Sequence, residues 1–273
     1  MKTQFASSLA LGIAILLLAG AASQSIDAQG SRQNSFEPPV VYQAAGPNNA
    51  SILGTIEEFR TALGGANNGN NAGPLADGRR EINWDGGGSA TTPAPTPFSG
   101  FLNNRGALFI TPGSGFVQAP PSGLATTFGN LSYEGIFRAF SQQRLFASIG
   151  DSRTDVRFFI PGSNGASGAT TRAFGAIFSD VDQPDGSDRG YQRDNRDSST
   201  LVEFFGVAGD LLFSGVVPSA PGNGNFSFFG AIFPDARIGR VVITAGDYAG
   251  PDDLPTRDVV MMDDFIFAEP RGR

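Results

Sequence analysis

Short apolar runs alternate with Gly, Pro, Asn and Asp turns from about residue 101 onward, and this alternation constrains the fold more than any motif. The 37 glycines and 18 prolines mark turns, and the runs between them have the length of strands. The pattern predicts an all-β domain over residues 101–270, a jelly-roll-like sandwich of about ten strands. The predicted strands are 107–110, 115–118, 144–149, 155–160, 172–181, 201–207, 211–217, 226–233, 238–245 and 258–267.

Two details of the pattern predict how strands pack. Residues 201–217 read as a hairpin around a Gly-containing loop at 208–210. The segment 174–180 (FGAIFSD) recurs as 229–235 (FGAIFPD), with alternate Phe and Ala on one strand face, as facing sheets require. Gly175 and Gly230 fall on the other face, where they would let a neighbouring element approach closely.

The chain before residue 101 has a different composition. Residues 23–50 are polar and predict a disordered leader. Residues 51–63 have apolar side chains at helical spacing, with Thr55 and Glu58 as a capping box and Gly64 as a stop. The rest of 51–100 predicts flexible Gly/Asn/Pro linkers around one short docked strand at 81–85, in which Trp84 would be buried.

The first 22 residues have the pattern of a cleavable signal peptide. One lysine precedes an apolar stretch that ends in small residues near Ala21 and Ala22. The apolar stretch is shorter than the roughly 20 residues that span a bilayer, so a membrane anchor is disfavoured. We therefore expect a secreted protein, extracellular or periplasmic, whose mature chain has no transmembrane anchor.

The composition excludes most catalytic chemistry. The chain has no His and no Cys, and its one lysine is Lys2. A histidine base, a thiolate nucleophile and a Cys/His zinc site are therefore excluded. Without Lys2, the chain has 18 arginines and 26 acidic residues, which gives a net charge of −8. This charge does not favour binding to nucleic acid. An enzyme would have to use paired carboxylates, as a glycosidase does, and no motif places Glu134 and Glu203 opposite each other.

Three segments carry a resemblance to uncharacterised bacterial exported β-sandwich proteins, and more broadly to PEP-CTERM-type exoproteins. They are residues 78–86 (GRREINWDG), 174–182 (FGAIFSDVD) and 259–267 (VVMMDDFIF). The resemblance covers roughly residues 51–270 and implies a secreted jelly-roll-like sandwich without an assigned activity. The C-terminal sorting helix of PEP-CTERM proteins has no counterpart after residue 267 in this sequence.

Carboxylates cluster in residues 180–188 (DVDQPDGSD), and calcium is the cofactor that such a loop would bind. Asp180, Asp182 and Asp185 are the candidate ligands. The spacing is not that of an EF-hand, because one residue is inserted before the third Asp and Tyr191 stands where a Glu is expected. The alternative is a solvated loop with surface ion pairs and no metal.

Asp263 is a fourth candidate metal ligand. Strand alternation along 259–267 predicts that one carboxylate of the pair Asp263 and Asp264 points inward and the other outward. An inward Asp needs a partner, either a structural calcium ion or an arginine such as Arg80, Arg237 or Arg240.

These features favour a non-catalytic binding or adhesion module of the cell envelope or extracellular matrix, with glycans or other envelope proteins as partners. The aromatic content is unusual for a sugar site, because 24 Phe accompany one Trp and four Tyr. Tyr133, Tyr191 and Tyr248 are the candidate exposed rings. The alternatives are a structural exoprotein that associates with itself and, third, a carboxylate glycosidase. The oligomeric state is left open.

Overall fold

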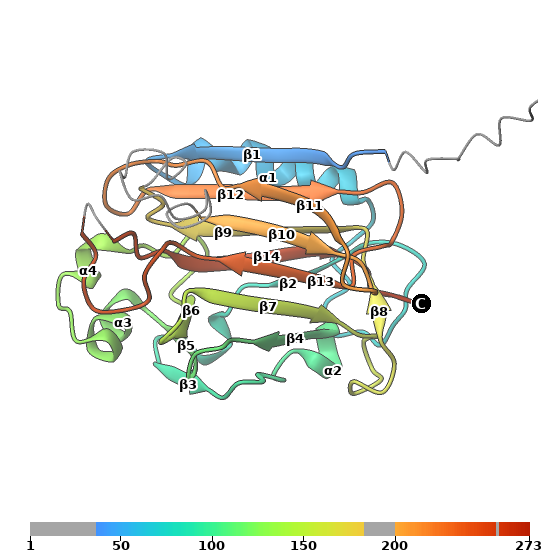
Figure 1. Ribbon diagram of the computed structural model, residues 1–273, viewed down its shortest axis with the longest axis horizontal. Coiled ribbons are helices and arrows are strands. Elements are labelled where there is room, and N and C mark those ends of the chain that lie inside the picture. Colours follow the sequence, from blue (N-terminus) through green and yellow to red (C-terminus); the bar gives the residue numbers. More distant parts are fainter. Residues whose placement is uncertain (1–36, 183–199, 255–256) are drawn as a thin grey trace, which may run out of the picture. The chain divides into compact units, whose positions relative to one another are not determined.

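All ten strands that the turn spacing predicts are present, with each end within three residues of its predicted position. The computed structural model describes residues 37–182, 200–254 and 257–273. Within them, fifteen strands form antiparallel sheets, and the two largest sheets stack as a sandwich (Figure 1). The predicted all-β sandwich is confirmed.

The larger sheet has eight strands, and β14 lies at its centre. Its order is β1-β12-β9-β14-β6-β5-β3, and β2 pairs with β14 beside β6. The bounds are β1 (Val40–Gly46), β12 (Phe226–Ile232), β9 (Ala173–Ser179), β14 (Met261–Ala268), β6 (Leu145–Ile149), β5 (Gly115–Ala119), β3 (Thr92–Ala94) and β2 (Arg79–Ile82).

The smaller sheet has five strands in the order β11-β10-β13-β7-β4. Its strands are β11 (Leu211–Val216), β10 (Leu201–Phe205), β13 (Arg240–Thr244), β7 (Arg153–Phe158) and β4 (Ala107–Ile110). β10 and β11 form the predicted hairpin. A separate two-stranded ladder joins β8 (Ala169–Thr170) to β15 (Arg271–Gly272).

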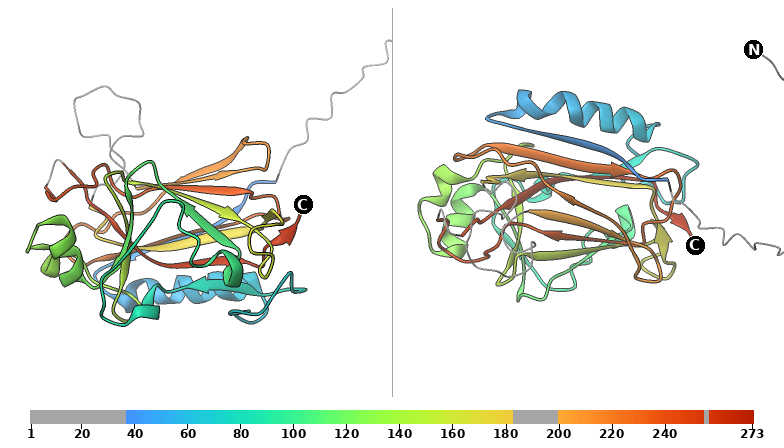
Figure 2. Two further views of the ribbon diagram at one scale, coloured as in Figure 1. Left: turned by 90° about the horizontal axis from the view of Figure 1, so that it is seen from below. Right: turned by 45° about the horizontal axis from the view of Figure 1, so that its top comes forward.

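Helix α1 (Asn49–Leu63) covers part of the outer face of the larger sheet (Figure 2). It begins at Asn48, whose side chain accepts a hydrogen bond from the Ser51 N–H at 3.2 Å. The predicted capping box of Thr55 and Glu58 is therefore wrong, because both residues lie inside the helix. The predicted stop at Gly64, which has a φ of 70°, is confirmed. The side chains that the helix buries are Ile52, Ile56, Phe59 and Leu63.

Four further short helical segments lie in the connections. Helices α3 (Pro121–Phe128) and α4 (Tyr133–Ile136) cover another part of the outer face of the larger sheet, beside β5 and β6. Helix α2 (Leu102–Arg105) and the 3-10 turn η1 (Asp85–Gly87) are single turns. The sequence did not predict α3, because eight residues with Pro121 and Gly123 are too short to show a helical period.

Strand β1 corrects part of the predicted leader. Residues 40–46 pair with β12 along the whole length of both strands, from Val40 opposite Ile232 to Gly46 opposite Phe226. The strand was missed because the segment VVYQAAG is short and follows a polar stretch, although it carries no charge and can complete a ladder. The remaining leader residues before 37 lie outside the described residues.

The two similar segments of the sequence are neighbours in the larger sheet. β9 and β12 pair so that Gly175 lies opposite Gly230, and the alternate Phe and Ala side chains of both strands enter the core between the sheets. A Cβ atom on Gly230 would lie 2.8 Å from the ring of Phe59, and one on Gly175 would lie 3.0 Å from it. The predicted close approach is confirmed, and the element that approaches is α1.

The core between the sheets is largely aromatic. Trp84 follows β2 and stacks on Phe146 with ring centroids 3.8 Å apart, while Phe265 and Phe109 meet its ring edge-on. Trp84 is buried, as predicted. Its indole Nε1 donates to the Asp263 carbonyl at 2.8 Å, so the docked strand is fastened to the middle of β14.

Candidate functional site

A β-bulge in β14 buries both Asp263 and Asp264. The register of β14 against β9 shifts between Met262 and Phe265, where the other neighbour of β14 changes from β6 to β2. Asp263 is fully buried and Asp264 is 5% exposed. The predicted inward and outward alternation is therefore wrong, because the bulge interrupts the two-residue period.

Hydrogen bonds hold the Asp263 carboxylate on both oxygens. The Phe140 N–H donates to its Oδ2 at 2.6 Å, and the Ser141 hydroxyl donates to its Oδ1 at 3.1 Å. Ser141 Oγ also lies 3.2 Å from an oxygen of Asp85, at the start of η1. The loop before β6 and the turn after β2 are thus both tied to β14.

Asp264 faces α1. Its Oδ2 lies 3.9 Å from Nη2 of Arg60, which also binds Glu81 at 2.8 Å, while its buried Oδ1 has no partner among the described residues. Burial raises the pKa of both Asp263 and Asp264, and the neighbouring Asp264 carboxyl raises that of Asp263 further. These shifts favour one proton on the pair, since two adjacent negative charges are strongly disfavoured without water.

The arginines predicted as partners of this pair bind elsewhere. Arg80 pairs with Glu269, and Arg240 has a nitrogen 3.8 Å from Asp155. Arg237 pairs with Asp235. The cation beside the pair comes from α1, a contact between distant segments that strand spacing alone does not reveal.

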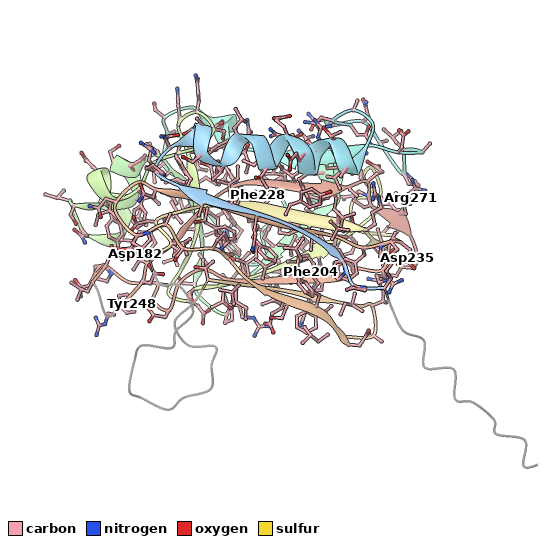
Figure 3. All side chains as sticks on the ribbon, turned by 90° about the horizontal axis from the view of Figure 1, so that it is seen from above. Asp182, Phe204, Phe228, Asp235, Tyr248 and Arg271 are labelled. Atoms are coloured by element: carbon pink, nitrogen blue, oxygen red, sulfur yellow. The ribbon has the colours of Figure 1, made fainter. Side chains whose placement is uncertain are left out.

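A second group of carboxylates lies at one end of the sandwich, where β9 ends and β12 and β14 begin. The acidic cluster consists of Asp180, Asp182, Asp253 and Asp258. Asp182 is close to Tyr248 at this end, and Asp235 and Arg271 mark the opposite end (Figure 3). The register places Ser179 opposite both Phe226 and Met261, so these strand ends lie side by side.

Asp180 is the buried member of the acidic cluster. It is fully buried, and its φ of 71° is a left-handed conformation that only a minority of non-glycine residues adopt. Its N–H donates to the Asn225 carbonyl at 3.0 Å. Neither oxygen of its carboxylate has a hydrogen-bond partner in the described structure.

The other members of the cluster each accept a backbone N–H. Asp182 Oδ1 accepts from Gly222 at 2.8 Å, and Asp253 Oδ1 accepts from Val259 at 3.1 Å. The Asp182 N–H lies 3.4 Å from Asp258 Oδ1. These bonds connect the end of β9 with the loops before β12 and β14.

The electrostatic environment of Asp180 is negative. Burial, followed by the charges of Asp182, Asp253 and Asp258, raises the pKa of Asp180 to about 8. Burial also raises the pKa of Asp253, and the charge of Asp253 is among those that raise the pKa of Asp180. Within the described residues, no three acidic side chains converge tightly enough to hold a metal ion as they stand.

The structure therefore divides the predicted metal ligands. Asp180 and Asp182 lie together in the acidic cluster, Asp185 lies outside the described residues, and Asp263 belongs to the buried carboxyl pair in β14. Asp253 and Asp258 were missed as members of the cluster. They lie far along the chain in a turn-rich segment, and only the pairing of β9 with β14 brings them to Asp180.

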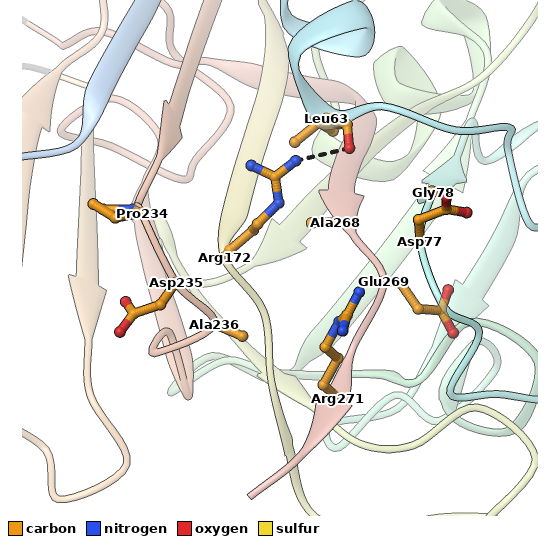
Figure 4. Close-up of a pocket in the computed structure, with 10 residues that line it drawn as sticks. All are labelled: Leu63, Asp77, Gly78, Arg172, Pro234, Asp235, Ala236, Ala268, Glu269 and Arg271. Atoms are coloured by element: carbon orange, nitrogen blue, oxygen red, sulfur yellow. Dashed lines mark hydrogen bonds between the residues drawn. The ribbon is translucent and has the colours of Figure 1, made fainter.

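A pocket of about 460 Å³ opens at the opposite end of the sandwich (Figure 4). Its charged groups are mostly engaged within the protein. Arg172 Nη2 donates to the last carbonyl of α1 at 2.8 Å, Arg271 donates to a carbonyl of the linker before β2, and Glu269 binds Arg80. Its lining residues are Leu63, Asp77, Gly78, Arg172, Pro234, Asp235, Ala236, Ala268, Glu269 and Arg271.

The three tyrosines that were predicted to be exposed differ in their burial. Tyr133 is fully buried and its hydroxyl donates to the Gly250 carbonyl at 2.6 Å, so it is not a surface platform. Tyr248 is partly exposed, and the guanidinium carbon of Arg257 lies 4.7 Å from its ring centroid. Tyr191 lies outside the described residues.

Comparisons of the chain with protein-family models, with curated proteins and with solved structures found no match. In the described part of the chain, no helix has the length and apolar character needed to cross a membrane.

Proposed function

We propose that this chain is an exported, non-catalytic binding or adhesion module of the cell envelope or extracellular matrix. The observation that carries the proposal is the convergence of loops at the acidic end of the sandwich. The end of β9, the segment before β12 and the loop between β13 and β14 meet there on a rigid two-sheet scaffold. Loops held by such a scaffold are a common place for ligand binding.

Glycans are the ligand class that we propose for this end. Carboxylate oxygens accept hydrogen bonds from sugar hydroxyls, and the partly exposed ring of Tyr248 lies beside them and would offer an apolar face to a sugar once the Arg257 guanidinium moves off it. The charge of the mature sequence also favours a neutral or cationic ligand over an anionic one.

A glycan array probed with the full exported chain, followed by titration of any glycan that binds, tests the proposal. We expect Tyr248→Ala to weaken binding by about tenfold or more, as loss of a central aromatic contact does. Arg271→Ala at the opposite end is the matched control and should leave the affinity unchanged. Absence of binding to any glycan, or equal affinity for Tyr248→Ala and wild type, would contradict the glycan assignment.

A specific observation favours self-association as a second candidate function. β1 and β11 are edge strands of the two sheets, each with a described neighbour on one side only, and neither contains a charged residue. Exposed apolar side chains lie along them, with Val40 59% and Leu211 52% exposed. Such edges pair readily with another strand, because native proteins usually protect them with charge or Pro.

Sedimentation over a range of protein concentrations tests this second candidate. Wild type should form dimers or larger species as concentration rises, and Val41→Lys should shift the chain toward monomer because it places a charge on the β1 edge. Leu131→Lys is the control, since Leu131 is 82% exposed but lies between α3 and α4. A wild-type chain that stays monomeric throughout rules out self-association.

A further inference from the structure

Asp180 is a buried carboxylate without a counter-charge. The groups that surround it electrostatically are Asp182, Asp253 and Asp258, and neither of its oxygens has a hydrogen-bond donor in the described structure. The nearby Gly224 N–H donates to the Ile136 carbonyl instead. A buried charge in this position is costly unless a proton or a cation neutralises it.

The surroundings of Asp180 favour a cation over a proton. Asp180 is fully buried with both carboxylate oxygens unpartnered among the described residues, and Asp253 lies close enough for its charge to raise the Asp180 pKa. A single shared proton would neutralise one of these two carboxyls, but it would leave Asp182 as a further negative charge beside a buried group. Several carboxylates from two chain segments are a set of oxygen ligands that calcium accepts.

We propose that Asp180 and Asp253 form the nucleus of a calcium site, and that Asp182 and Asp258 complete it by turning toward the ion. All four side chains offer oxygen donors, and the chain has no His or Cys that would select zinc or copper. Calcium accommodates irregular carboxylate and carbonyl ligand sets better than magnesium does. This inference rests on the proposed function, because the calcium site lies at the end of the sandwich where we propose that the ligand binds.

Calcium would add a further link between the end of β9 and the loop before β14, which the Asp182 N–H and Asp258 Oδ1 already connect at 3.4 Å. Asp180 and Asp182 follow β9, whereas Asp253 and Asp258 belong to the loop that leads into β14. An ion bound by all four would fix this loop, and with it Tyr248, against the end of β9. Calcium would therefore stabilise the fold and order the proposed glycan surface.

The test is calorimetric titration of calcium into the full exported chain, together with thermal unfolding in EDTA and in calcium. We expect about one ion to bind per chain with a Kd of about 0.1–1 mM, the range of extracellular modules. Calcium at about 10 mM should then raise Tm by about 3–10 °C. A sodium chloride sample of equal ionic strength controls for screening of the acidic surface.

The near-isosteric variant Asp180→Asn gives the sharpest comparison. In EDTA at a pH above about 8, where the Asp180 carboxyl is ionised, the variant should melt above wild type, because it removes a buried charge. In calcium the order should reverse, because the variant loses a ligand. Asp252→Asn is the control, since Asp252 is exposed at the same end and pairs with Arg257 at 3.5 Å. It should respond to calcium as wild type does.

Asp253→Asn provides a second variant in case Asp180→Asn does not fold, and it should also lose calcium binding. The proposal is overturned if wild type shows neither binding heat nor a calcium-specific rise in Tm. It is also overturned if either Asn variant binds calcium as wild type does. Calcium binding is measured without any glycan. A chain that binds no calcium therefore does not contradict the glycan proposal, and a chain that binds no glycan does not contradict the calcium proposal.

Discussion

Asp263 and Asp264 are adjacent in sequence and buried together in the bulge of β14. Burial raises the pKa of both groups, so the folded chain retains a proton that the unfolded chain releases above about pH 4. Because the folded chain binds this proton more tightly than the unfolded chain does, the pair stabilises the fold fully at acidic pH. That contribution to the free energy of unfolding is lost as pH rises through the folded-state pKa.

We expect Asp264→Asn to remove much of this pH dependence. The amide can donate permanently to Asp263, in place of the shared proton. The free energy of unfolding, measured by urea denaturation in EDTA from pH 4 to pH 8, should fall less steeply with pH in the variant than in wild type. For the control variant Asp252→Asn, the free energy of unfolding should change with pH as it does in wild type. Parallel curves for Asp264→Asn and wild type would show that the pair does not share a proton.

Gly230 shows how a residue without a side chain fixes a contact between elements. We expect Gly230→Ala to destabilise the fold by about 1–3 kcal/mol, because the new Cβ would lie 2.8 Å from the Phe59 ring. Gly54→Ala on the exposed side of α1 meets no atom within 4 Å and should stabilise by about 0.5–1 kcal/mol. Chemical denaturation measures both, and a neutral Gly230→Ala would show that α1 moves away without cost.

At the scale of elements, a buried ion pair connects β2 to the residue after β14. Arg80 Nε and Nη2 donate to the two oxygens of Glu269 at 2.6 and 2.7 Å, and both side chains are buried. Glu269 also accepts from Asn68 and from the Leu75 N–H. The same carboxylate therefore holds the linker before β2 in place.

We expect Glu269→Gln to cost about 3–5 kcal/mol, because it leaves the Arg80 charge buried without a counter-charge. Asp252→Asn, which breaks the exposed pair with Arg257, should cost less than about 1 kcal/mol. Urea unfolding of the two variants provides the comparison. Similar small losses in both would mean that water reaches Arg80 in solution.

The sequence predicted elements far better than it predicted contacts between them. Turn residues and apolar runs located ten strands and α1, because these signals are local. The bulge at Asp263 depends on β2 replacing β6 beside β14, which no local pattern encodes. For the same reason the sequence indicated Asp180 and Asp182 as a group but not their neighbours Asp253 and Asp258.

At the scale of the whole molecule, the aromatic core extends through both sheets. Trp84 reports on the region where β2, β6 and β14 meet, whereas far-UV circular dichroism reports on all strands. We expect urea unfolding curves from tryptophan fluorescence and from circular dichroism to coincide, because one continuous core favours a single transition. Two separate midpoints would show that the Trp84 region unfolds independently.

The central position of β14 has a consequence for the order of assembly. It is the last long strand in the sequence, yet it joins β9 and its neighbours to β2, β6 and their neighbours. During synthesis the larger sheet can exist only as two separate halves until β14 has emerged, and contacts of such long sequence separation form slowly. The larger sheet is therefore completed only after nearly the whole chain has been made, which is compatible with the export that we propose.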